Sequence, residues 1–161
     1  MLILVPVDGS AAAELALAHA LWLVHGRPEA AIALLNVQTR DMIGLSDIDV
    51  QTKAERAMAC RNFARAMRGA IKVCNNAGVR FQVRTEIGPI CETIDRVARE
   101  VRADQIVMGT RGLGRLSSLL LGSIAIGVIH MVRIPVTLVK SGSDARGVID
   151  IALDRSTLHP S

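Results

Sequence analysis

The chain alternates short apolar runs with longer helical patterns, and this alternation restricts its fold more than any other feature. Residues 2–7 and 31–37 are almost wholly apolar, as expected of strands that are buried on both faces of a sheet. A helical pattern follows each strand, and repeated units of this kind form a parallel sheet with right-handed crossovers. We expect strands at 2–7, 31–37, 79–87, 104–108 and 136–139, and helices at 10–24, from about 50 to 74, from Gly88-Pro89 to 101, and at 123–132.

The composition agrees with an α/β domain that has helices on both faces of its sheet. The 161 residues suffice for one domain with a substantial core, and half of them are hydrophobic although only 2% are aromatic. The net charge is +4, but the basic residues are scattered rather than gathered in a dense block. With almost no aromatic side chains for base stacking, the chain is not expected to bind nucleic acid.

The same sequence predicts a cytoplasmic protein without a membrane segment. The first residues, MLILVPVD, carry no positive charge ahead of the apolar run and meet Asp8, so we interpret them as a core strand. The longest uncharged run, 116–132, has 17 residues and contains three serines and two glycines. A bilayer span needs about 20 predominantly apolar residues. The three cysteines, in a chain without a secretory signal, favour a reducing compartment.

A glycine-rich stretch, GTRGLGRLSSLLLGS, lies between the fourth expected strand and the helix after it. In open parallel sheets, ligands bind at such strand-to-helix junctions. Gly109 and Gly112 would let a ligand approach the backbone, and Gly122-Ser123 would open a helix whose free N–H groups suit a phosphate. The stretch therefore predicts a phosphorylated nucleotide as the ligand, although glycines after strands also serve turns and packing.

Two motifs together resemble the universal stress protein family. Gly109-x-x-Gly112, nine residues and then Gly122-Ser123 is similar to the ATP-binding signature of that family, and Val7-Asp8-Gly9-Ser10 is similar to the end of its first strand. The resemblance covers roughly residues 1–140. It implies a Rossmann-like open sheet of five parallel strands in the order 3-2-1-4-5, related to the adenine-nucleotide alpha hydrolases.

The resemblance also implies which residues bind ATP, with or without Mg²⁺. Pro6 and Val37 would lie beside the base, Met108 would back the site, and the backbone at Ile124 and Ala125 would complete the phosphate cradle. The expected site residues are Pro6, Val7, Asp8, Val37, Met108, Gly109, Arg111, Gly112, Arg115, Gly122, Ser123, Ile124 and Ala125.

Charge divides this site into two parts. A carboxylate at Asp8 would repel phosphates, so we expect the phosphates beside strand 104–108 and the nucleoside beside Asp8. Asp8 could also serve as an N-terminal helix cap, and the two roles are compatible. Arg111 and Arg115 could contact phosphate oxygens or could be solvated surface residues.

No catalytic set accompanies the expected site. The chain lacks a P-loop lysine motif and a G-x-G-x-x-G after the first strand, and its histidines show no metal-ligand spacing, so we expect neither catalytic residues nor a metal site. We therefore expect a regulatory or signalling module for the stress response that binds ATP. The alternatives are a nucleotide-free interaction module of the same fold and a slow ATPase.

Two further expectations concern assembly and a cysteine. By resemblance the protein forms a homodimer through the last strand, with protein partners that the sequence does not identify. Residues 141–161 are expected to be a tail outside the domain, either mobile or adding a strand to a partner's sheet. Cys91 lies near a helix start, which can lower the pKa of a thiol, so redox sensing is a further hypothesis.

Overall fold

The computed structural model describes residues 1–39, 53–110 and 121–140. The strands are β1 (Leu2–Pro6), β2 (Ala31–Gln38), β3 (Arg80–Ile87), β4 (Gln105–Gly109) and β5 (Val136–Val139). The helices are α1 (Ala11–Val24), α2 (Lys53–Ala77), α3 (Ile90–Glu100) and α4 (Ser123–Met131). These nine elements alternate as the apolar pattern predicts, so the α/β assignment is confirmed.

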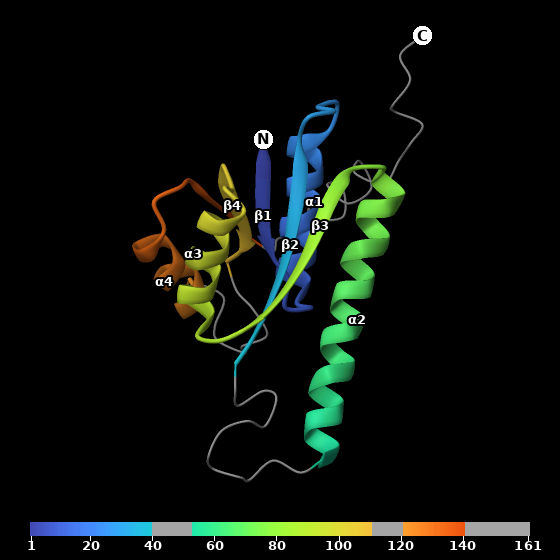
Figure 1. The fold of residues 1–161 in the computed structure, drawn as a ribbon, viewed down its shortest axis with the longest axis vertical. Helices are drawn as coiled ribbons and strands as arrows, with labels where there is room; N and C mark the ends of the chain where they lie inside the picture. Colours follow the sequence, from blue (N-terminus) through green and yellow to red (C-terminus); the bar gives the residue numbers. More distant parts are fainter. Residues whose placement is uncertain (40–52, 111–120, 141–161) are drawn as a thin grey trace.

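All five strands form one parallel sheet in the order β3-β2-β1-β4-β5 (Figure 1). β1 is central and pairs with β2 from Leu2↔Ala31 to Pro6↔Leu35. On its other side it pairs with β4, where Leu4 lies opposite Ile106. The chain crosses to the other half of the sheet between β3 and β4, so the carboxyl ends of β1 and β4 are neighbours. The predicted strand order is therefore confirmed.

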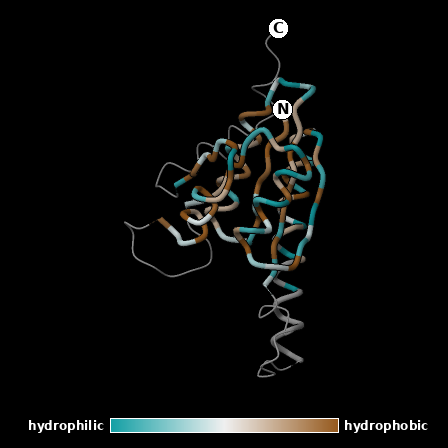
Figure 2. Tube along the Cα trace, turned by 60° about the vertical axis from the view of Figure 1, so that its left-hand side comes forward, coloured by the Kyte–Doolittle hydropathy of each residue, from teal (hydrophilic) through white to brown (hydrophobic). Residues whose placement is uncertain are grey.

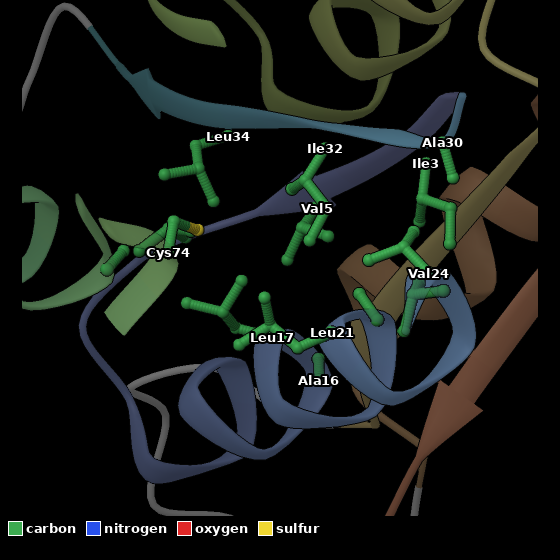
Figure 3. Packing of buried hydrophobic residues seen from close by; sticks show 14 of the residues in the cluster. Ile3, Val5, Ala16, Leu17, Leu21, Val24, Ala30, Ile32, Leu34 and Cys74 are labelled. Carbon is green, nitrogen blue, oxygen red and sulfur yellow. The ribbon is translucent and has the colours of Figure 1, made fainter. Parts of the chain in front are cut away.

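Helices cover both faces of the sheet and enclose two hydrophobic clusters. Odd-numbered residues of β1 and even-numbered residues of β2 pack with α1 and α2 (Figure 3). The opposite side chains of these strands pack with α3 and α4. The strands at the centre of the domain are accordingly strongly hydrophobic (Figure 2). Each Val, Leu or Ile that is fully buried in this way contributes about 1.5–3 kcal/mol, which makes the sheet a rigid support for its loops.

Local signals explain most helix boundaries. Ser10 caps α1, since its Oγ accepts a hydrogen bond from Ala13 N at 3.2 Å. Pro89 is the N-cap of α3 rather than its first helical residue, one position earlier than the proline preference suggests. In α2, Met67 and Cys74 are buried and pack in the cluster with β1 and β2. In the ranges that the structure describes, no helix combines the length and the apolar character needed to cross a bilayer.

Candidate functional site

The carboxyl ends of the three central strands bring several predicted site residues to one side of the sheet. Met108 and Val37 both pack in the cluster beneath α3 and α4. Pro6 and Met108 each lie two residues beyond the pair Leu4↔Ile106, so they are level with one another on neighbouring strands. Met108 is buried, whereas Pro6 and Val37 are half-buried. This part of the site is therefore an apolar surface at the edge of the core.

Val7 does not join that surface with its side chain. The side chain is 6% exposed and packs in the cluster beneath α1 and α2, on the other face of the sheet. Its backbone N donates to Leu35 O at 2.7 Å and continues the pairing with β2. Val7 can therefore contribute to a ligand site only through its main chain.

The turn from β1 to α1 holds Asp8 at the surface. Gly9 has φ +84°, a conformation that favours glycine, and it lets the chain turn between Asp8 and Ser10. Asp8 Oδ1 accepts a hydrogen bond from Ser10 N at 2.9 Å. Ser10 is thus the helix cap, and Asp8 orders the turn before it. Within the described residues Asp8 Oδ2 has no hydrogen-bond partner, so this exposed oxygen is free to accept a hydrogen bond.

Gly109 is the last residue of β4, and its lack of a side chain has a packing reason. A Cβ at this position would lie 2.6 Å from the Cβ of Ala12, closer than real atoms approach. Gly109 therefore allows the first turn of α1 to pack on the end of β4. The packing alternative for this glycine is supported by a contact, whereas its approach to a ligand remains a prediction.

Thr110 connects three elements at the phosphate side of the predicted site, and the sequence analysis did not single it out. Its N donates to Val139 O of β5 at 2.9 Å, and its O accepts from Gly122 N, ahead of α4, at 2.9 Å. Its Oγ1 is buried and has no hydrogen-bond partner among the residues described. A buried hydroxyl without a partner requires an explanation, and a bound ligand could supply one.

The N-terminus of α4 presents backbone donors beside Thr110. Gly122 is the N-cap, and its O accepts from Ile126 N at 3.1 Å. The amides of Ser123, Ile124 and Ala125 precede that first helical bond, as the first N–H groups of a helix do. The first turn carries no acidic residue, so the positive end of the helix dipole suits an anion.

Three predicted site residues, Arg111, Gly112 and Arg115, lie outside the described residues. So does the tail, residues 141–161. The structure therefore brings together Pro6, Asp8, Val37, Met108, Gly109 and the start of α4 at one end of the sheet, and the arginines remain predictions.

Cys91 lies beneath α4, and its environment differs from the expectation. Its Sγ is 3.7 Å from Ile124 O, in a weak hydrogen bond, and a Cβ on Gly127 would be 2.7 Å from Sγ. Burial, followed by the charge of Glu92, raises the pKa of the Cys91 thiol. The expected lowering by the helix start is therefore wrong, because the cover by α4 outweighs it.

Comparison with known proteins identifies the family. Residues 1–140 match the universal stress protein family. The chain is 29% identical over 119 residues to a universal stress protein A-like protein of Arabidopsis thaliana, covering 70% of this chain and 68% of that one. It is 31% identical over 148 residues to a universal stress protein of Mycobacterium tuberculosis, covering 86% of this chain. The match spans only 45% of the mycobacterial protein.

Solved structures share the fold. The hypothetical protein MJ0577 superposes with a TM-score of 0.76 at 26% identity, covering 88% of this chain and 96% of that one. A universal stress family protein from Arabidopsis thaliana, solved with AMP bound, gives a TM-score of 0.65 at 19% identity and covers 89% of this chain and 94% of its own. A universal stress protein in complex with cAMP gives 0.66 at 22% identity, covering 88% and 98%. The strand order, the site at the strand ends and the match over residues 1–140 lead to one conclusion: the chain belongs to the universal stress protein family.

Proposed function

We propose that this protein binds ATP, with or without Mg²⁺, at the carboxyl ends of β1, β2 and β4, and acts in the cytoplasm as a nucleotide-dependent regulatory module of the stress response. One observation carries the proposal. The Asp8 turn and the N-terminus of α4 follow β1 and β4, which are neighbours in the sheet. A hydroxyl-binding carboxylate and a phosphate-binding helix end therefore flank one apolar surface.

The described residues fit the nucleoside half of the ligand. Adenine is flat and largely apolar at its faces, and Pro6, Val37 and Met108 offer half-buried or buried apolar atoms at the strand ends. Asp8 Oδ2 would accept a hydrogen bond from a ribose hydroxyl, as an acidic residue does in other nucleotide-binding folds. The base and the sugar would thus be held from β1 and β2.

The phosphate half would be bound from β4 and α4. The amides of Ser123, Ile124 and Ala125 are the donors that a phosphate requires, and Thr110 Oγ1 is a further hydroxyl beside them. Gly112, Arg111 and Arg115 would complete this half, as the sequence pattern predicts. Bound Mg²⁺ would neutralise phosphate charge.

The relatives support an adenine nucleotide, since two structural neighbours were solved with AMP and with cAMP. A regulatory role agrees with the residues around the α4 N-terminus, because Thr110, Gly122 and Ser123 include no general base. Slow ATP hydrolysis through a bound metal and water is the enzymatic alternative. A nucleotide-free interaction module is the other alternative, which the glycine signature disfavours.

We further propose that two copies pair through β5. β5 is an edge strand of the sheet, and all four of its residues are partly exposed. Beside it, α4 exposes Ile126 and Ile129 at 42% each and Met131 at 39%, and such grouped apolar exposure is typical of an interface. Light scattering is expected to give a dimer that Ile129→Glu weakens; a monomer for the unchanged protein at high concentration would contradict this.

Denaturing the purified protein and identifying any released small molecule by mass spectrometry tests the proposed ligand. Recovered ATP supports the proposal, and recovered AMP or cAMP would identify that nucleotide as the ligand instead of ATP. The same preparation, incubated with ATP and Mg²⁺, is expected to release phosphate no faster than a heat-denatured control. Turnover well above that control would favour the ATPase alternative.

A further inference from the structure

Asn36 is a buried polar residue near the end of β2, at a position where an apolar side chain would serve the packing of the core equally well. Asn36 is only 6% exposed, and it lies on the face of β2 where Ile32 and Leu34 pack with α1 and α2. Its Nδ2 donates to Val7 O at 2.5 Å. Just before it in the pairing, Val7 N donates to Leu35 O at 2.7 Å. A side-chain bond therefore extends the connection between β1 and β2 beyond the last ladder bond.

Within the residues that the structure describes, the oxygen of the same carboxamide lacks a hydrogen bond, which costs stability. Asn36 Oδ1 is buried and has no hydrogen-bond partner in the described part of the chain. Only Nδ2 can donate to the Val7 carbonyl, so rotating the amide would not improve the site. An apolar residue such as those at 32 and 34 would avoid the unsatisfied oxygen. The contact with Val7 is thus what the carboxamide provides.

That contact reaches Asp8 through the main chain. The Val7 carbonyl belongs to the peptide group whose N–H is that of Asp8, so holding Val7 O orients the plane from which Asp8 starts. Asp8 Oδ1 then accepts from Ser10 N at 2.9 Å, and Ser10 caps α1. One hydrogen bond and one peptide group therefore connect β2 to Asp8, and Ser10 N holds the carboxylate from the other side.

We propose that Asn36 is a positioning residue, which sets the orientation of Asp8 for the ribose hydroxyls of a bound nucleotide. The inference rests on the proposed nucleotide binding. Asn36 lies on the α1 and α2 side of the sheet, whereas Met108 and Val37 lie on the α3 and α4 side. It therefore acts through the Val7 peptide and determines preference for ligands that carry free 2′ and 3′ hydroxyls.

Calorimetric titration with ATP and with 2′,3′-dideoxy-ATP separates this role from a structural one. The unchanged protein is expected to prefer ATP by roughly tenfold, since a hydrogen bond to a charged acceptor contributes at least that ratio. Asn36→Leu should reduce the preference to near one and leave the affinity for 2′,3′-dideoxy-ATP unchanged. Asp8→Ala should do the same, and the double variant should lose no more than either single variant.

The control is Cys74→Ala, a fully buried residue of the same cluster, which should destabilise the protein and keep the preference for ATP. Asn36→Ala serves as a second variant if Asn36→Leu does not fold. Unchanged preference in the Asn36 variants overturns the inference, even when ATP still binds. Equal binding of both nucleotides by the unchanged protein overturns it as well and leaves nucleotide binding standing.

A measurement without nucleotide distinguishes this inference from the proposed function. Hydrogen exchange of the Ser10 amide reports its bond to Asp8 Oδ1. Asn36→Leu should speed this exchange at least tenfold more than Cys74→Ala does. Equal exchange rates in the two variants would show that Asn36 does not orient Asp8. Faster exchange in Asn36→Leu without any nucleotide binding would contradict the proposed function, but it would still show that Asn36 orders the Asp8 turn.

Discussion

Gly109 and Ala12 are in direct contact between β4 and α1, and a Cβ on residue 109 would be 2.6 Å from the Cβ of Ala12 and 2.8 Å from its carbonyl carbon. This contact sets the distance between the first turn of α1 and the end of β4. Because Asp8 precedes α1 and the glycine stretch follows β4, the same contact holds the two halves of the site together.

Gly109→Ala should therefore lower the free energy of unfolding by about 1–3 kcal/mol, the usual effect of overpacking. Urea unfolding followed by circular dichroism measures it. The control is Gly69→Ala at an exposed position of α2, where a Cβ would meet nothing within 4 Å. That change should raise stability by roughly 0.5–1 kcal/mol. Unfolding of Gly109→Ala at the same urea concentration as the unchanged protein would contradict the packing role.

Thr110→Val keeps the shape of the side chain and removes the buried hydroxyl that has no partner among the described residues. If Thr110 Oγ1 binds phosphate, the variant should bind ATP about 2- to 10-fold more weakly, as expected for one hydrogen bond. Its stability should be unchanged or slightly higher. Thr137→Val on β5 is the matched control and should leave the affinity for ATP unchanged. Equal affinity of Thr110→Val and the unchanged protein would exclude the hydroxyl from the site.

Glu86 should make stability depend on acid pH. Arg84 and Arg96 each bridge Glu86 and Glu100, at distances from Glu86 of 3.2 and 3.0 Å, and this network joins β3 to α3. Hydrogen bonds from Arg96 and then Arg84 hold the pKa of Glu86 below its usual value. The folded state therefore binds the proton less tightly than the unfolded state, so the contribution is present above about pH 4.3 and is lost as the pH falls through the folded pKa.

Comparison of the unchanged protein with Glu86→Gln tests this sign. The stability difference between them should be largest near neutral pH and should shrink as urea unfolding is repeated towards pH 3. High salt should also reduce it, because the network is partly exposed to solvent. A difference that grows on acidification would contradict the assigned direction.

Cys74 and Cys91 should react slowly with thiol reagents in the folded protein. Burial raises the pKa of Cys74 to about 12, and burial with Glu92 raises that of Cys91. The side chain of Cys60 lies outside the described residues, so the measurement uses a Cys60→Ser background. At pH 8, both thiols should label far more slowly than in the denatured chain. Labelling of Cys91 at the denatured rate would restore the redox hypothesis.

The fold followed from sequence where local signals agree with one another. The apolar run of β1 ends at Asp8. The apolar run of β5 follows Pro135, and β5 is found at the predicted residues 136–139. Pro89 was predicted to be the first helical residue of α3, but it is the N-cap, because a proline fits both the N-cap and the first turn. Such boundaries depend on only a few atoms, whereas the order of elements depends on the whole pattern.

The polar details of the site could not be predicted because they depend on neighbours far along the chain. Asn36 lies in an apolar run, and only its contact with Val7, 29 positions away, sets it apart. Thr110 was overlooked between two glycines, although its place between β4 and α4 decides its contacts. The pKa of Cys91 was predicted in the wrong direction because α4, which covers it, begins 32 residues later.

Calorimetric titration of nucleotide-free protein with ATP and Mg²⁺ tests the central claim most directly, with Gly122→Val as the site variant. Gly122 has φ −64°, which valine can adopt, so this change should place a side chain over the α4 amides without unfolding the helix. The control is Gly69→Val, at an exposed position of α2 where a Cβ would meet no atom within 4 Å. The account predicts micromolar binding by the unchanged protein and by Gly69→Val, at ~8 kcal/mol, and none by Gly122→Val. Absence of heat at millimolar ATP from well-folded unchanged protein would contradict it, and would leave the glycines as turn and packing residues.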